Sequence, residues 1–171
     1  LYLPSDRLQA EKLTEALLED GEPAYVRVGR NAVEDVYEED AVPFEMNKAT
    51  VLREGQDLAI IACGEMVLAA KRAGQALEKQ GIHAKVIDMY CVKPMDEEAV
   101  MGAARTGRII TVEEHSFYGG LGSMVCQLTA AKSPCKVVNL TLPDTPVITG
   151  SSQEIFDHYG LNAEHIVRVA K

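Results

Sequence analysis

The chain has 171 residues, which is enough for one complete domain and an additional segment. Its hydrophobic content of 47 % and charged content of 25 % are ordinary for a soluble globular protein. The formal net charge is −9 without a long basic run, which argues against binding to nucleic acid or to an anionic membrane surface. No apolar run approaches the ~20 residues that cross a bilayer, and the four cysteines lack the spacing of a metal site or a disulfide framework. We therefore expect a cytoplasmic protein.

The first 30 residues predict one strand–helix–strand unit. Residues 1–3 are apolar and strand-like, and Ser5 is expected to cap a helix that ends near Gly21. Residues 24–30 alternate between apolar and polar side chains, as a strand does. A single unit of this size cannot bury a core alone, so we expect it to be the end of a larger domain.

A regular pattern of strands and helices follows an irregular acidic stretch. Residues 31–47 favour a linker or an extended crossing segment. Beyond them, the pattern predicts strands at 49–52, 58–63, 84–90, 109–112 and 136–140. It predicts helices after Gly64, after Pro94, after the glycines at 119–122, at the capping box of Ser151 and Glu154, and after Asn162. This alternation indicates a three-layer α/β domain with a mainly parallel sheet.

The stretch from Gly107 to Gln127 is the most distinctive part of the pattern. A β-branched strand leads into an expected turn of Glu113, Glu114 and His115, and a glycine-rich elbow then opens the next helix. A dinucleotide fingerprint would need a third glycine where Val125 stands. Open N–H groups at a helix start can bind an anion, but the pattern favours a structural turn.

Three side chains are candidates for binding. A carboxylate could orient His115 as a general base, but Glu114 and His115 alternate along a strand and no nucleophile is visibly paired with the histidine. We expect His115 to be an exposed loop residue that contacts a partner or a substrate. Arg27 and Arg30 suit a phosphate or a carboxylate, although surface salt bridges explain their spacing equally well.

Several motifs of the chain occur together in a known order. They are Leu3-Pro-Ser-Asp6, Ala24-Tyr-Val-Arg-Val-Gly-Arg30, Glu54-Gly-x-Asp57, Val86-Ile-Asp88, Lys93-Pro-Met-Asp96, Val112-Glu-Glu-His115, Gly119-Gly-Leu-Gly-Ser123, Gly150-Ser151 and Tyr159-Gly-Leu161. This order spans essentially the whole chain and resembles the C-terminal part of transketolase-type enzymes, which depend on thiamine diphosphate.

The resemblance implies a domain division and a fold. Residues 1–40 would be the incomplete end of a pyrimidine-binding domain, and residues 41–171 would be the transketolase C-terminal domain. The latter is a three-layer α/β/α fold whose mostly parallel sheet has one antiparallel edge strand. The full enzyme would hold thiamine diphosphate and Mg²⁺ on regions outside this segment. We therefore expect no catalytic, cofactor-binding or metal-binding residue here, and no activity of this chain alone.

The resemblance also implies substrates and partners. Arg30 matches an arginine that contacts the sugar phosphate, so Arg30 and His115 are the expected substrate-binding residues. The form of the elbow is most similar to separate C-terminal subunits of split transketolases, which move a two-carbon ketol unit between sugar phosphates in the pentose phosphate pathway. Such a subunit would join an N-terminal region or subunit and form a homodimer. Alternatives are a fragment of 1-deoxy-D-xylulose-5-phosphate synthase or of a 2-oxoacid dehydrogenase beta subunit, and a non-catalytic module that docks partner subunits.

Overall fold

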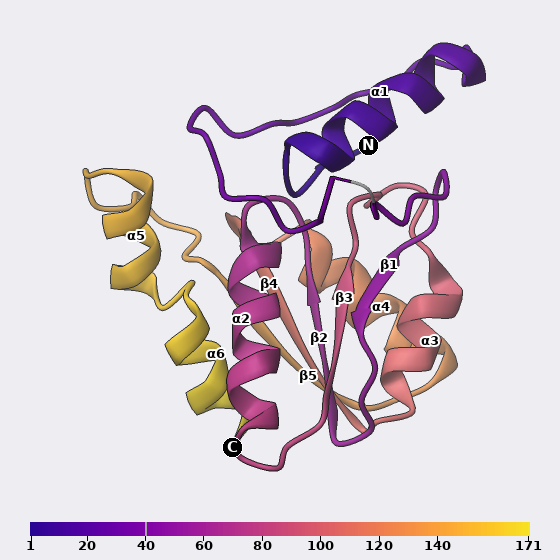
Figure 1. The fold of residues 1–171 in the computed structure, drawn as a ribbon. Coiled ribbons are helices and arrows are strands. Elements are labelled where there is room, and N and C mark those ends of the chain that lie inside the picture. Colours follow the sequence, from indigo (N-terminus) through magenta and orange to yellow (C-terminus); the bar gives the residue numbers. More distant parts are fainter. Residues whose placement is uncertain (40) are drawn as a thin grey trace.

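The structure is a computed structural model that describes residues 1–39 and 41–171, and within them a five-stranded mixed sheet forms the centre (Figure 1). The strands are β1 (Thr50–Arg53), β2 (Leu58–Ala62), β3 (Ala84–Asp88), β4 (Arg108–Ser116) and β5 (Lys136–Leu142). Their order is β1-β3-β2-β4-β5; β1 pairs antiparallel with β3, and the other pairs are parallel. The predicted mostly parallel sheet with one antiparallel edge strand is confirmed.

Helices cover both faces of this sheet, which gives three layers (Figure 1). They are α2 (Met66–Glu78), α3 (Glu97–Ala104), α4 (Leu121–Lys132), α5 (Ser152–Tyr159) and α6 (Ala163–Ala170). The central strand β2 is buried on both sides: Ile60 packs in the core beneath α2 and α6, and Ile61 packs in the core beneath α3 and α4. A strand covered on both faces reads as a continuous apolar run, which is why the sequence identified β2 readily.

The predicted helix caps are confirmed in the C-terminal half and wrong at the first helix. Ser151 and Glu154 form the reciprocal capping box of α5, and the side chain of Asn162 caps α6. At α1 (Arg7–Asp20), the cap is Asp6, whose Oδ1 accepts from the N–H of Gln9 at 2.8 Å. Ser5 lies one residue too early, and its hydroxyl is directed to another partner instead.

Residues 1–3 and 24–30 form much less sheet than their alternation predicts. Tyr2 makes isolated bridges to Val26 and to Cys91, with backbone hydrogen bonds of 2.9 Å to the carbonyl of Tyr25 and from the N–H of Arg27. No named strand forms over either segment in the described part of the chain. Because the two segments pair with each other at a single residue, neither has the continuous ladder of hydrogen bonds that defines a strand.

The acidic segment after residue 30 has no helix or strand in its described residues, as expected, but it is not solvated throughout. Residues 31–35 are exposed, whereas Val36 and Tyr37 are buried. The backbone N–H groups of these two residues donate to Oδ2 of Asp6 at 2.7 and 2.9 Å. Asp40, at the predicted domain boundary, lies outside the described residues.

A buried carboxylate joins this segment and α1 to the sheet. Asp88, at the carboxyl end of β3, is fully buried, and its Oδ2 accepts hydrogen bonds from Ser5 Oγ (2.8 Å), Gln9 Nε2 (2.9 Å) and Tyr37 Oη (2.7 Å). Its Oδ1 has no partner among the described residues. Burial raises the pKa of Asp88 to about 6, although the three hydrogen bonds act in the opposite direction.

The Asp88 pKa predicts a pH dependence of stability. Because the folded-state pKa lies above the ordinary value of 3.8, the protonated form favours folding, and this contribution is lost as the pH rises from about 4 to about 6. A difference of about two units corresponds to roughly 3 kcal/mol. Urea denaturation measures the free energy of unfolding of the parent chain and of Asp88→Asn. Between pH 4 and pH 7, the value for the parent chain should fall by roughly 3 kcal/mol relative to the value for Asp88→Asn.

A second variant controls this experiment. Tyr37→Phe removes a donor that lowers the Asp88 pKa, so it should move the same transition to higher pH. If the parent chain and Asp88→Asn follow parallel stability curves across this range, the assignment to Asp88 is wrong.

Candidate functional site

The glycine elbow is closed by a carboxylate of the chain itself. Glu113 is buried, and its two carboxylate oxygens accept from the backbone N–H groups of Leu121 (2.8 Å) and Gly122 (2.7 Å). These N–H groups lie at the start of α4, where the helix dipole stabilises negative charge. The anion position at this helix is therefore filled internally, which confirms the prediction of a structural turn.

Two glycines of the elbow make this approach possible. A Cβ atom at Gly120 would lie 2.1 Å from Oε2 of Glu113, and one at Gly122 would lie 2.6 Å from Cγ of Asn139. Both distances are far below van der Waals contact, so only glycine fits beside these groups. The glycines serve the packing of α4 on β4 and β5.

The residues Glu113, Glu114 and His115 lie in strand β4, so the prediction of a turn there is wrong. Three consecutive polar residues are typical of a turn. They continue the strand here because Glu113 and Glu114 have partners that are distant in sequence. Residues 113 and 115 share one face of the strand, as the two-residue period requires. Nδ1 of His115 lies 3.6 Å from Oε2 of Glu113.

His115 is a half-buried strand residue and not the exposed loop residue that we expected. Burial lowers its pKa below the ordinary 6.5; Arg27 acts in the same direction, and Glu113 and Glu114 oppose it. The imidazole is therefore neutral at pH 7 and can both donate and accept a hydrogen bond. It has no charge with which to attract a phosphate.

Arg27 forms an ion pair with Glu114, whose side chain is largely buried. This contact fastens residues 24–28 to β4 across 87 positions of sequence. The salt-bridge interpretation is thus confirmed for Arg27. No spacing rule could have identified Glu114 as its partner.

The structure brings Arg27, and not Arg30, close to His115. Arg27 and His115 both line a cavity of about 490 Å³, whose other walls include Tyr25, Cys63 and Met124. Arg30 is exposed and is not part of that lining. The two predicted substrate-binding residues therefore do not share this cavity.

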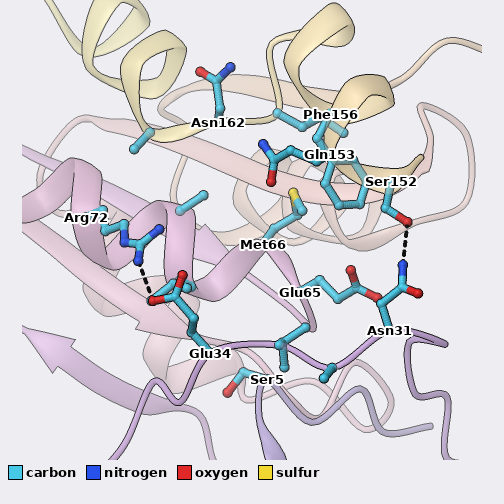
Figure 2. Close-up of a pocket in the computed structure, with 16 residues that line it drawn as sticks. Ser5, Asn31, Glu34, Glu65, Met66, Arg72, Ser152, Gln153, Phe156 and Asn162 are labelled. Atoms are coloured by element: carbon cyan, nitrogen blue, oxygen red, sulfur yellow. Dashed lines mark hydrogen bonds and ion pairs between the residues drawn. The ribbon is translucent and has the colours of Figure 1, made fainter. Parts of the chain in front are cut away.

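A second cavity, of about 340 Å³, was not anticipated from the sequence. Figure 2 shows it between the segment Asn31–Glu34 on one side and α2 and α5 on the other. Its rim is joined by a hydrogen bond from Asn31 Nδ2 to Ser152 Oγ (3.3 Å) and by an ion pair between Arg72 and Glu34 (2.7 Å). The lining residues are too far apart in sequence for any motif to connect them.

The described ranges, 1–39 and 41–171, contain no group of three or more His, Cys, Asp or Glu side chains that could hold a metal ion. None of the helices in these ranges is long and apolar enough to cross a membrane.

A family model supplies the decisive comparison. The model described as transketolase, C-terminal domain, matches residues 47–166. The chain belongs to the transketolase family. The resemblance drawn from the motifs is confirmed, and the matched range coincides with the sheet and the helices that cover it.

Individual members of the transketolase family match nearly the whole chain. One of the subunits of the apulose-4-phosphate transketolase of Phocaeicola vulgatus is 50 % identical over 171 residues, covering 99 % of this chain and 54 % of that protein. The 1-deoxy-D-xylulose-5-phosphate synthase of Heliobacterium modesticaldum is 36 % identical, covering all of this chain and 27 % of that protein.

A solved transketolase structure extends the match to three dimensions. A structure described as "Split gene transketolase, inactive beta4 tetramer" superimposes with a TM-score of 0.89 at 37 % identity, over 99 % of this chain and 55 % of that one. The chain thus spans about half the length of its split-type transketolase relatives and about a quarter of the synthase.

The closed elbow predicts which glycine cannot be replaced. Gly120→Ala should reduce the free energy of unfolding by about 1–3 kcal/mol, because its new methyl group overlaps the buried Glu113 carboxylate. Gly102→Ala is the matched control: Gly102 lies inside α3 with open space around it, so alanine should stabilise the chain by about 0.5–1 kcal/mol. Urea denaturation measures both, and equal stabilities of the two variants would contradict the prediction.

Proposed function

We propose that this chain is the C-terminal part of a transketolase that transfers a two-carbon ketol unit between sugar phosphates. The observation that carries the proposal is the 50 % identity, over 99 % of the chain, to one of the subunits of an apulose-4-phosphate transketolase. The split-gene transketolase structure supports the same arrangement. In this proposal the active enzyme forms when the chain assembles with an N-terminal region or subunit, and the assembled protein is a cytoplasmic dimer.

In this proposal the N-terminal region or subunit holds the cofactor, thiamine diphosphate with Mg²⁺. The start of α4, where the sequence left an anion site as the less favoured alternative to a structural turn, is occupied by the carboxylate of Glu113. That carboxylate would repel a diphosphate, so this helix start does not fit the cofactor. We assign no step of the cofactor's chemistry to the residues of this chain.

The proposed division places the end of a pyrimidine-binding domain at residues 1–40 and the C-terminal domain at residues 41–171. Two observations support it: the family model begins at residue 47, and the segment before it packs outside the sheet layers. Tyr25 and Val28 are 67 % and 65 % exposed. Apolar side chains this exposed would be covered by further strands of the larger domain.

Arg30 is the proposed contact for the substrate phosphate. Its guanidinium is exposed, and it follows the segment that Arg27 anchors to Glu114. A planar guanidinium binds a phosphate through two parallel hydrogen bonds. His115, being neutral and half-buried, is proposed to hydrogen-bond the substrate or the partner subunit.

The synthase relatives make a second function worth testing. Mixing the chain with its N-terminal partner, thiamine diphosphate and Mg²⁺ should give ketol transfer from xylulose 5-phosphate to an aldose phosphate. A parallel reaction that supplies pyruvate and a triose phosphate tests the synthase, because the methyl group of 1-deoxy-D-xylulose 5-phosphate cannot come from xylulose 5-phosphate. Accumulation of that product with release of CO2, and no ketol transfer in the first reaction, would favour the synthase. A stable complex without either reaction would favour the docking module.

The Arg30 proposal predicts a substrate-dependent loss of activity. In the assembled enzyme, Arg30→Ala should lower kcat/KM for a phosphorylated ketose about 10–100-fold, chiefly through KM, because it removes a charged contact worth about 1.5–3 kcal/mol. For the unphosphorylated ketose, Arg30→Ala should lower kcat/KM by less than about threefold. Arg105→Ala, an exposed arginine at the end of α3, is the matched control and should leave both values unchanged. Equal losses with both ketoses would contradict a phosphate contact.

A further inference from the structure

The cavity beneath Asn31–Glu34 has the dimensions of a small-molecule site. Its volume of about 340 Å³ lies at the lower end of the range for ligand pockets. One wall comes from Asn31–Glu34, a second from the first turns of α2, and a third from α5 and the start of α6. None of these groups takes part in the proposed phosphate contact.

The cavity combines an apolar surface with side chains that both donate and accept hydrogen bonds. Val33, Leu68 and Phe156 supply the accessible apolar surface, and the buried Met66 and Leu161 lie behind it. Asn31, Gln153 and Asn162 supply side-chain amides, and Ser152 supplies a hydroxyl. Each amide has two donor hydrogens and an acceptor oxygen, but some of these are used within the chain. Gln153 and Asn162 each donate one hydrogen to Asp157, and the oxygen of Asn162 caps α6. This composition matches a ligand whose own polar groups also donate and accept.

Glu65 is the one charged side chain of the lining without a counter-ion, as far as the chain is described. Arg72 is neutralised by Glu34 at 2.7 Å, whereas Glu65 takes part in none of the ion pairs and makes no capping bond to α2. Burial, followed by repulsion from Glu114, raises the pKa of Glu65. Its carboxylate lies against Gly29, where a Cβ atom would be 1.8 Å from Oε1.

The resulting charge decides between ligand classes. Glu34, Glu65 and Arg72 sum to one negative charge, which disfavours a phosphate or a carboxylate inside the cavity. An ammonium would suit the charge, but it only donates hydrogen bonds. It could not pair with the second amide hydrogens that Asn31 and Gln153 retain beyond their bonds to Ser152 and Asp157. Hydroxyl groups suit both the carboxylate and the amides. They can donate to the carboxylate of Glu65, and they can both donate to and accept from the side-chain amides.

We propose that this cavity binds a neutral polyhydroxylated ligand, a sugar, with Glu65 accepting from its hydroxyls and Phe156 packing on its apolar face. The amide of Asn31, held to Ser152 by a long hydrogen bond of 3.3 Å, exchanges that bond for one to the ligand. The inference rests on the lining of the cavity and not on ketol transfer. It therefore stands or falls separately from the proposed function.

Titration of the ¹⁵N-labelled chain with D-ribose and D-fructose tests this binding. The side-chain amide signals of Asn31 and Gln153 should shift in a saturable way, with a Kd of roughly 1–50 mM for ligands of this size. Inorganic phosphate and putrescine, the probes for an anion site and an amine site, should not shift them. Shifts with either probe but with neither sugar would overturn the proposal, as would the absence of any saturable shift with sugar.

Three variants and one control variant locate the site. Glu65→Gln and Phe156→Ala should each weaken sugar binding at least about fivefold, and Glu19→Gln, the same change at an exposed position of α1, should not alter it. Gly29→Ala keeps the carboxylate but displaces it, so it should weaken binding as well. Amide spectra establish that each variant is folded. Unchanged affinity in folded Glu65→Gln and Gly29→Ala would overturn the role of Glu65, and with it the site.

Discussion

The buried carboxylate of Asp88 is the contact on which the arrangement of the N-terminal segment depends. Its Oδ2 collects three donors, two from α1 and its preceding turn and one from Tyr37, at separations of 51 to 83 residues. A buried carboxylate is tolerated only when hydrogen bonds replace its lost water. Leaving a buried partner unsatisfied costs about 1–3 kcal/mol. The three donors and the acceptor therefore stabilise one another, and residues 1–39 are held on the sheet by polar contacts as well as by packing.

A second buried carboxylate, Glu113, has a comparable role at the end of β4. In parallel α/β sheets the carboxyl ends of the strands normally present groups to a ligand. Here Oδ2 of Asp88 and both carboxylate oxygens of Glu113 accept from protein donors. Residues 1–3 cross this edge, and Leu3 is hydrogen-bonded to the backbone of Tyr90 and Gly64. Part of the usual ligand edge of the sheet is thus used for internal contacts. The rest borders the cavity of about 490 Å³ that Cys63 and His115 line, and residues 30 and 31 lie outside it.

Short-range patterns predicted the fold well, and long-range polar partners limited the prediction of the site. The alternation of apolar strands and helices and the capping residues Ser151 and Asn162 are confirmed, because each depends on neighbours within a few positions. The polar end of β4 and the anchoring of Tyr37 were missed, because their partners are distant in sequence and their residue types are typical of loops. The same limit applies to the cavity of Figure 2, which separate segments of the chain build. The substrate roles of Arg30 and His115 stay predictions.

The segment from Arg27 to Tyr37 is anchored at both ends and exposed between them. Arg27 is paired with Glu114 at one end, while Asp6 and Asp88 hold Tyr37 at the other, and residues 30–35 are exposed. The exposed Arg30 therefore stands next in sequence to Asn31, which lines the cavity, while the unpaired negative charge of that cavity comes from Glu65 at the start of α2. The guanidinium suits a phosphate, whereas the carboxylate suits a hydroxyl donor. Since Arg30 and Asn31 depend on the same two anchors, a change at Asp88 or Glu114 would displace them together.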